Sequence, residues 1–435
     1  MTDVLHDPRT YARGAPLEIV QRLRAQGPVV WVDEPELTGL PRGPGYHLVL
    51  AHELVTAVLK DPATFSSAVG ATQIRDPATA DDLRYVQRMM LNMDPPEHSR
   101  LRRMVARSFT PRAVSALEAR IAEHAGHIVD RMLAGPAEVD FAKQVAAELP
   151  LLALADVLGV PVQDRWLLFD WSNRVIGWLD PDYATSSTFD AAAGTDLARQ
   201  AVALRPHPDA DGVMPDPRSR LGMPDLYRYA HLLAAAKRAD PGADVMSILL
   251  AQLDDLGGKI TLEEFENMFW LFAVAGNETL RNGLPGGMIA LLEYPEEQRE
   301  LRADPALFGT AVDEMLRWWT PVMVFRRTAT RDTRLGGVSV RAGEKVVVSF
   351  LAANRDPEVF VQPDEFDLRR SPNPHLVFGH GPHFCLGAHL ARVQMRSLFG
   401  ELLRRTTWIE PAGEPSFLRS NFQRGVKRLP IRWRA

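Results

Sequence analysis

One cysteine stands in a setting that favours chemistry. Cys385 is the only cysteine of the 435-residue chain, and it lies in the stretch FGHGPHFCLGAHLAR at residues 378–392. The residues that follow, LGAHLARVQMRSLFGELLRR, place apolar side chains at helical spacing, so Cys385 stands at the start of a predicted helix. Unpaired backbone amides and the positive end of the helix dipole stabilise a thiolate there. The sulfur is therefore a candidate nucleophile or metal ligand, and the flanking glycines would let the backbone approach a large flat group.

Three kinds of site fit this cysteine, beside the plain alternative of a small buried apolar residue. A nucleophile would need a base, and none is identifiable near it in the sequence. Zinc requires several cysteine or histidine ligands at regular spacing, and because there is no second cysteine, a zinc site would depend on scattered histidines. The third kind is a haem, with the thiolate as its iron ligand. The residues themselves leave these alternatives open.

The positions around the cysteine carry a resemblance to a known family. Phe378, Gly381, His383, Cys385 and Gly387 match every fixed position of the haem-binding signature of the cytochrome P-450 family. This resemblance implies that Cys385 is the thiolate ligand of the iron of haem b, with Phe378 and Gly387 beside the cofactor. Thiolate ligation would then supply the electron density that favours O–O cleavage.

A second motif lies upstream, in TLEEFENMFWLFAVAGNETLRNGLPGG. Thr261 and Glu264 form the pattern of a capping box, and the apolar run at residues 268–276 predicts a helix that crosses the interior. Polar residues follow directly at 277–279, where burying an acid and an alcohol without partners would be costly. The structural alternative is a helix that emerges into solvent. We expect Pro285 to kink this helix or to end it early, because proline removes a helical hydrogen bond.

The letters AGNET resemble the oxygen-activation motif of the same family. By that resemblance Gly276 makes room beside the haem, while Thr279 and Glu278 relay protons, with Glu278 connected to solvent. A proton relay is needed because O–O cleavage consumes protons in a site otherwise kept dry.

Further family positions carry basic and acidic residues, each of which alone would be read as a surface charge or a helical ion pair. Four of them would bind the haem propionates by charge-assisted hydrogen bonds: His98, Arg102, Arg327 and His383. Three others would be buried together and hold the cysteine loop in shape, a structural role: Glu314, Arg317 and Arg370.

The family resemblance also places a substrate pocket. We expect substrate contacts in residues 69–90, on the long helix, in residues 322–325 and near Gln423, although core packing is the alternative for each. The named pocket residues are Trp270, Phe272, Ala273, Val322, Val324, Phe325 and Phe422. Because most of them are apolar, we expect a lipophilic substrate.

The elements that would position these residues are mostly helical. A stretch at residues 112–135 shows apolar residues at three- and four-residue steps, and strand-like runs are short, at YHLVLA, VMVFRRTAT and EKVVVSF. The sequence predicts a mainly α fold with small β-sheets. Because the resemblance covers nearly the whole chain, it implies a single cytochrome P-450 domain over residues 1–435, of prism-like fold. The haem would lie between the long oxygen-binding helix and the cysteine-loop helix.

One segment departs from the family pattern. Residues 181–224 interrupt the helical segments with a proline-rich excursion, which we interpret as either a lid over the access channel or a disordered loop.

Composition narrows the class of protein. A net charge of −5 gives no general attraction to nucleic acid or anionic membranes, so any basic patch must be local. A lone cysteine excludes an internal disulfide, and the first residues contain no apolar run of signal or anchor length. We therefore expect a cytoplasmic protein with no membrane anchor and no nucleic-acid partner.

These observations predict a haem-thiolate monooxygenase that inserts one atom of O2 into a C–H bond of a lipophilic molecule. Short stretches such as AGNETLRN resemble those of the actinobacterial members that oxidise sterols, terpenoids and branched fatty acids. The alternative substrate is a phenol or aryl alkyl ether, oxidised by ring hydroxylation or O-demethylation. A peroxide-driven peroxygenase or a non-enzymatic haem sensor would not need the Glu278–Thr279 pair.

The chain shows no flavin or iron–sulfur domain, so electrons from NAD(P)H would arrive through a ferredoxin and its reductase. Basic residues on the cysteine side of the haem would form the docking patch: Arg102, Arg103, Arg107, Arg392 and Arg396.

Overall fold

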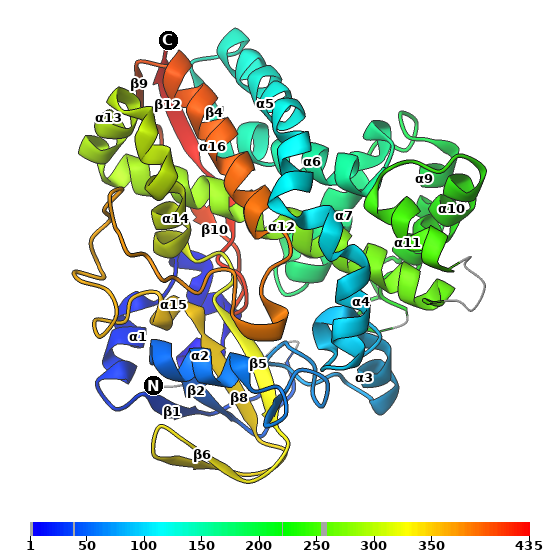
Figure 1. Ribbon diagram of the computed structural model, residues 1–435, viewed down its shortest axis with the longest axis vertical. Helices are drawn as coiled ribbons and strands as arrows, with labels where there is room; N and C mark the ends of the chain where they lie inside the picture. The colour runs from blue at the N-terminus through cyan, green and yellow to red at the C-terminus, as the bar shows by residue number, and fades with distance from the viewer. Residues whose placement is uncertain (1–2, 38–39, 220, 254–258) are drawn as a thin grey trace.

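A computed structural model describes residues 3–37, 40–219, 221–253 and 259–435 (Figure 1). The α-helices are α1 (Leu17–Arg24), α2 (His52–Lys60), α3 (Ala80–Val86), α4 (Glu97–Val105), α5 (Pro111–Ala134), α6 (Glu148–Leu158), α7 (Arg165–Ile176), α8 (Pro181–Ala184), α9 (Asp196–Val202), α10 (Pro224–Ala239), α11 (Val245–Leu253), α12 (Leu262–Glu293), α13 (Pro295–Ala303), α14 (Phe308–Trp319), α15 (Phe350–Ala353) and α16 (Ala388–Arg405). The strands are β1 (Val29–Val32), β2 (Tyr46–Val49), β3 (Phe65–Ser66), β4 (Glu138–Asp140), β5 (Val324–Ala329), β6 (Thr333–Leu335), β7 (Val338–Val340), β8 (Lys345–Ser349), β9 (Trp408–Pro411), β10 (Ser416–Phe417), β11 (Val426–Arg428) and β12 (Pro430–Arg434). The predicted class, mainly α with small sheets, is confirmed.

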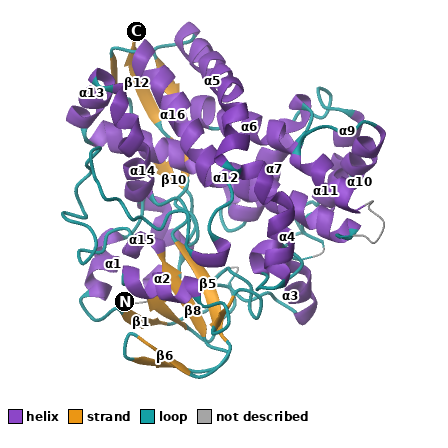
Figure 2. Ribbon diagram, viewed as in Figure 1, coloured by secondary structure: helices purple, strands orange, loops and turns teal. Residues whose placement is uncertain are grey.

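The largest sheet gathers strands from distant parts of the chain. Its order is β1-β2-β8-β5-β3, with β2 and β8 parallel and the other neighbours antiparallel. Along β8 the buried side chains alternate between the two faces, since Val347 joins one apolar cluster while Val346 and Val348 join another. Figure 2 shows this sheet at one end of the molecule, with helices filling most of the rest.

Helix α12 runs through the centre of the helical part (Figure 1). It begins with the predicted capping box, in which Thr261 accepts from the Glu264 amide and the Glu264 carboxylate accepts from the Thr261 amide. Apolar side chains on most of its circumference are buried against α6, α7, α10 and α14. A helix buried on all sides is stabilised chiefly by this packing.

The prediction that α12 ends early at Pro285 is wrong, because the helix continues through Pro285 to Glu293. Tight packing on α14 accompanies the proline. A Cβ added to Gly286 would lie 2.0 Å from the Trp319 ring, so α12 and α14 are in close contact there. Tertiary contacts of this kind offset the hydrogen bond that a proline removes.

The excursion at residues 181–224 is not a bare loop, although its position 220 lies outside the described residues. It contains α8 and α9 and is anchored on α7, where Asp170 accepts hydrogen bonds from the backbone amides of Thr188 and Phe189, both at 2.9 Å. The buried Asp164 accepts from the hydroxyl and the amide of Thr195 in the same way. The segment therefore packs on the helical core.

None of the described helices, α12 included, combines the length and the apolar character that spanning a bilayer would need.

Candidate active site

A large cavity lies between the middle of α12 and the loop that carries Cys385. The volume of this cavity is about 260 Å³. Gly276 and Thr279 of α12 line one side, and the segment 377–387 with the first turn of α16 lines the other. The sequence-predicted residues that line it are His98, Arg102, Phe272, Gly276, Thr279, Val322, Phe325, Arg327, Phe378, His383, Cys385 and Gly387. Residues nearly 290 positions apart along the chain, from His98 to Gly387, therefore meet at one cavity.

The cysteine loop is held in a fixed shape by its own backbone. The Cys385 amide donates to the Phe378 carbonyl at 2.9 Å, which closes the loop below the cavity. Gly381 has φ +69°, and a Cβ there would lie 2.4 Å from the Leu59 carbonyl oxygen, so only glycine fits against the end of α2. Cys385 stands just before α16, as the sequence predicted.

The thiol of Cys385 is surrounded by protein but faces the open cavity. Burial raises the pKa of the Cys385 thiol, whereas a hydrogen bond from the Gly387 amide and the charges of Arg102 and Arg392 lower it. These last three groups favour the thiolate, the form that binds a metal. Arg392 also lies 4.5 Å over the Phe378 ring and donates to Asp313 at 2.7 Å, which fixes one edge of the loop.

Positive charge without a partner marks the rim of this cavity. Arg327 is buried, its Nη1 donates only to the Arg326 carbonyl at 2.8 Å, and burial lowers its pKa to about 10. Arg102 donates to the Phe384 carbonyl of the cysteine loop. Within the described residues, neither guanidinium has a carboxylate within 4.0 Å. A buried charge such as that of Arg327 calls for an anionic partner.

Two histidines lie beside these arginines. The rings of His98 and His383 are 4.0 Å apart, and Nδ1 of His98 is buried without a hydrogen-bond partner. Burial, together with neighbouring positive charge, lowers the pKa of His98 to about 4 and that of His383 to about 2, so both rings are neutral donors or acceptors. Four sequence-predicted residues thus gather around one region that an acid group would fill.

The residues present fit a haem. The cavity is bounded by a thiol on one side and by apolar residues on most of its wall, and its rim carries two histidines and two arginines that have no carboxylate partner among the described residues. These parts match the iron ligand, the flat ring and the two carboxylates of that group. The zinc alternative is not supported, because the described residues contain no group of three or more histidine, cysteine, aspartate or glutamate side chains that could hold a metal.

Two of the three residues predicted from the AGNET motif, Gly276 and Thr279, line the α12 side of the cavity. The Thr279 hydroxyl donates to the Ala275 carbonyl at 3.0 Å and lines the cavity. A Cβ on Gly276 would come within 2.8 Å of Leu154 of α6, so glycine leaves room at the point where the cavity meets that helix. Leu154, which the sequence reasoning missed, is therefore part of the wall.

The third residue, Glu278, is placed differently from the expectation. Its side chain is fully buried and does not line the cavity. Its carboxylate forms an ion pair with Arg281 and accepts from the Asn282 amide at 2.9 Å, and the Arg281 guanidinium lies 5.1 Å from the centre of the Tyr183 ring. These neighbours cover the carboxylate, so Glu278 has no exposed surface of its own, and the expected connection to solvent stays a prediction. The three-residue spacing of Glu278 and Arg281 on one helix could have revealed the pair.

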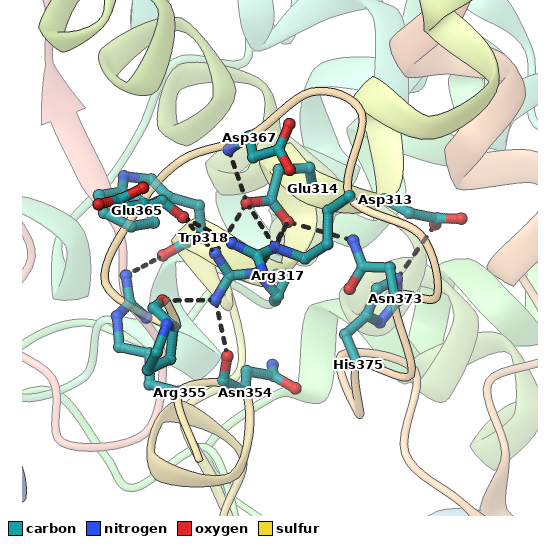
Figure 3. A network of polar contacts seen from close by, with 12 residues as sticks. Asp313, Glu314, Arg317, Trp318, Asn354, Arg355, Glu365, Asp367, Asn373 and His375 are labelled. Atoms are coloured by element: carbon teal, nitrogen blue, oxygen red, sulfur yellow. Dashed lines mark hydrogen bonds and ion pairs between the residues drawn. The ribbon is translucent and has the colours of Figure 1, made fainter. Parts of the chain in front are cut away.

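Glu314 and Arg317, two of the three residues predicted to be structural, lie in a buried polar network (Figure 3), and Arg370 also belongs to this network. Glu314 and Arg317 are both fully buried and meet in two hydrogen bonds of 2.7 Å, and Arg370 Nε lies 3.1 Å and 3.2 Å from the two Glu314 oxygens. The arginines also bind the carbonyls of Asn354, Val361, Gln362, Pro363 and Glu365. The network thus fixes the segment that leads into the cysteine loop.

A second cavity of about 100 Å³ adjoins the first, with Leu91, Leu271, Ala275, Thr279, Val322 and Phe325 lining both. The predicted substrate contacts Trp270, Phe422 and Gln423 line this second cavity. Residues 71–73, 86 and 89, from the predicted stretch 69–90, line it as well. Two predicted pocket residues lie elsewhere. Ala273 is fully buried on another face of α12, and Val324 points to the opposite face of β5 from Phe325, because side chains alternate along a strand.

Comparison with known proteins agrees with this geometry. The cytochrome P-450 family model matches residues 234–432. A steroid C26-monooxygenase of Rhodococcus jostii is 35% identical over 428 residues, covering 98% of this chain and 83% of the relative. A methyl-branched lipid omega-hydroxylase of Mycobacterium bovis is 36% identical, with 94% and 89% covered.

Solved structures give the same result for the fold. A Mycobacterium marinum cytochrome P-450 in complex with pseudoionone superposes with a TM-score of 0.83 at 36% identity, covering 96% of this chain and 95% of that one. The fold predicted from the sequence is thereby confirmed. This chain belongs to the cytochrome P-450 family and is a haem-containing monooxygenase that uses O2.

Proposed function

We propose that this enzyme hydroxylates a C–H bond of a sterol, a terpenoid or a branched fatty acid, with electrons from NAD(P)H delivered by a ferredoxin and its reductase. The observation that carries the proposal is the second, mostly apolar cavity, which adjoins the haem cavity at Thr279 and reaches Trp270 and Phe422. A lipophilic molecule in this cavity would lie beside the haem site. The names of the two relatives, which refer to a steroid and to a branched lipid, support this substrate class.

The proposed roles of the side chains follow from their places. Cys385 would hold the iron, and His98, Arg102, Arg327 and His383 would bind the propionates. When bound, the haem supplies the one-electron and oxygen chemistry. The protein supplies the rest: apolar walls that exclude water, and the Thr279 hydroxyl, which can move a proton at the cavity surface.

Glu278 would take part in proton transfer from a position behind the cavity wall. Its carboxylate faces Arg281 and Asn282, so a proton passing between Glu278 and Thr279 requires a change of side-chain conformation at Glu278. We therefore assign Thr279 as the group at the cavity, Gly276 as the residue that makes room, and Glu278 as the residue behind them.

The electron donor would dock where the cysteine loop comes nearest to the surface. Arg102 of α4 contacts that loop, and Arg103 and Arg107 beside it are exposed. Arg392 forms an ion pair with Asp313 at 2.7 Å, and Arg396 forms one with Glu118 at 3.9 Å. The double variant Arg103→Glu with Arg107→Glu is therefore the better test, because reversing Arg392 or Arg396 would also break an ion pair. The double variant should slow reduction by ferredoxin at low salt while leaving dithionite reduction unchanged; equal rates with ferredoxin would exclude this surface.

Three further features belong to the same proposal. The chain acts as one domain over residues 1–435, since α12 contacts helices from both halves of the sequence. Residues 181–224 would form a lid region, because Arg218 of this segment lines the second cavity. A cytoplasmic location would give access to the NAD(P)H that the electron chain requires.

The alternative substrate class is a phenol or aryl alkyl ether. It would suit the second cavity, but the names of the two relatives refer to a steroid and to a branched lipid. A peroxygenase or a haem sensor would gain nothing from the polar Glu278–Thr279 pair, so both remain less favoured. NADH consumption with a surrogate ferredoxin and no added peroxide would separate the monooxygenase from both.

An optical titration tests the proposal directly. The purified holoenzyme is titrated with sterols, terpenoids, branched fatty acids and alkylphenols while the Soret band is followed for loss of iron-bound water. A saturable shift with one lipid class, followed by a hydroxylated product in turnover, would support the proposal. A shift with alkylphenols alone would overturn it. Cys385→Ser should abolish the thiolate-type carbon monoxide spectrum, and a retained spectrum would refute the ligand assignment.

A further inference from the structure

A third, outer cavity continues the line of the first two. It offers about 60 Å³ and lies among the N-terminal segment, residues 73–75, the end of α7, residues 216–218 and residues 420–422. It shares Gln73, Val175, Ile176, Arg218 and Phe422 with the second cavity. The second cavity in turn shares Thr279 with the one at Cys385. The three cavities thus form a series that leads from the reaction centre to the lid region.

The outer cavity differs from the other two because a carboxylate, that of Asp216, lines it beside two arginines. Arg75 and Arg218 both face one carboxylate, that of Asp216, at 2.7 Å and 3.3 Å. Arg218 also donates to the Arg75 carbonyl at 2.8 Å, and the Arg75 guanidinium stacks 4.1 Å from the centre of the Trp178 ring. Two guanidinium groups against one carboxylate leave an excess of one positive charge on the wall.

Arg218 is the link between this charge and the substrate cavity. Its side chain is 8% exposed and lines both the outer and the second cavity. Burial, and then the charge of Arg218, lowers the pKa of Arg75 to about 10, so the two guanidinium groups oppose one another's charge. An added anion would relieve this repulsion.

An unpartnered histidine points to a ligand at the same place. His6 is 2% exposed, lines the outer cavity, and neither of its ring nitrogens has a hydrogen-bond partner. Buried polar atoms are normally hydrogen-bonded, and an exception needs an explanation. A ligand oxygen beside His6 would accept the hydrogen bond that the ring has available.

We propose that the outer cavity binds the carboxylate of an elongated, amphipathic substrate through Arg218, with Arg75 and His6 beside it, while the apolar end lies over the reaction centre. The inference rests on the proposed function and narrows it, since it favours fatty acids or steroid acids over neutral sterols and terpenoids. Arginine suits this task because its planar fork matches a carboxylate. Oxidation would then occur at the end of the molecule remote from the carboxylate.

Matched ligands test this inference on the holoenzyme. Dissociation constants are measured from the Soret shift for a methyl-branched fatty acid and its methyl ester, and for a steroid acid and its methyl ester. Because hydrogen bonds to a charged group are stronger than those to a neutral one, the acid should bind at least about tenfold tighter than its ester. A preference with only one of the two skeletons would identify the source of the carboxylate.

Two variants with opposite expected effects on the acid-to-ester preference separate the loss of the site from damage to the fold. Arg218→Gln should bring the acid-to-ester preference close to one. Asp216→Asn removes the competing carboxylate and should increase the preference, a gain that a damaged fold would not produce. Arg199→Gln serves as the control, because Arg199 lies on α9 of the same excursion, is 47% exposed and pairs with Asp196. It should leave both constants unchanged.

The possible outcomes separate this inference from the proposed function. Equal affinity for acid and ester in the unmodified enzyme, with hydroxylation of both, would overturn the carboxylate site and leave the monooxygenase function standing. An acid-to-ester preference that is the same in Arg218→Gln and Asp216→Asn as in the unmodified enzyme would also overturn it. No Soret shift with any of the four ligands would overturn the proposed substrate class together with this inference.

Discussion

Replacing Glu314 by glutamine would leave two buried arginines without their counter-charge. Glu314 is fully buried, and it accepts hydrogen bonds from Arg317, Arg370, the Asp367 amide and Asn373. Glutamine has nearly the same shape, so the change alters charge far more than packing. Two positive charges would then share a site that lies out of contact with water.

The size of the effect follows from burial. Removing one partner of a buried ion pair costs about 3–5 kcal/mol, a large part of the roughly 5–15 kcal/mol by which a folded domain is stable. Because the arginines also bind the carbonyls of residues 361–365, loss of the network should loosen the segment that leads to Cys385. We expect weaker haem retention and a smaller thiolate-type carbon monoxide spectrum.

Glu296→Gln on α13 is the matched control. Glu296 and Arg299 have the same three-residue helical spacing as Glu314 and Arg317, but their side chains are 75% and 69% exposed. Exposed pairs contribute only about 0–1 kcal/mol. Urea unfolding of both holoenzymes, followed by circular dichroism and by the Soret band, compares the two changes. If Glu314→Gln destabilised the enzyme by no more than Glu296→Gln, the reasoning from burial would be refuted.

Three other perturbations probe the relay, the helix packing and the outer cavity. Thr279→Ala should leave haem binding intact but let O2 be consumed without equivalent product; full coupling would show that protons arrive by another route. Gly286→Ala should lower stability by about 1–3 kcal/mol, since its Cβ would lie 2.0 Å from Trp319, whereas Gly309→Ala, with open space at its Cβ, should not. Burial holds the pKa of His6 below its usual 6.5, so the unfolded chain binds this proton more readily and substrate-free stability should fall as pH drops below 6.5. His6→Phe should reduce that slope in urea titrations at pH 7 and pH 5, and an unchanged slope would show that His6 does not contribute.

Local sequence patterns were enough to predict the two helices that bound the site and part of the site itself. The capping box at Thr261 and the apolar run after it predicted α12, and the helical spacing after Cys385 predicted α16. The signature around Cys385 predicted which loop would face the cavity. These features depend on residues close together in the sequence, where helical period, capping and glycine conformation act directly.

The same patterns could not decide which side chains face the cavity. Ala273 and Val324 have the right composition for a pocket, yet packing against other elements turns them away from it. Glu278 occupies the predicted turn of α12, but its ion pair with Arg281 keeps it behind the cavity wall. Pro285 does not end α12, because the contact with α14 holds the helix in place.

The sequence by itself determined the fold class, the thiol and the long helix opposite it, because each is encoded in a continuous stretch of residues. Only the tertiary structure placed His6, Arg75 and Arg218 around one cavity and left the His6 ring without a partner. The physical reason is that the burial, charge balance and hydrogen bonding of these side chains depend on neighbours that lie far away in the chain.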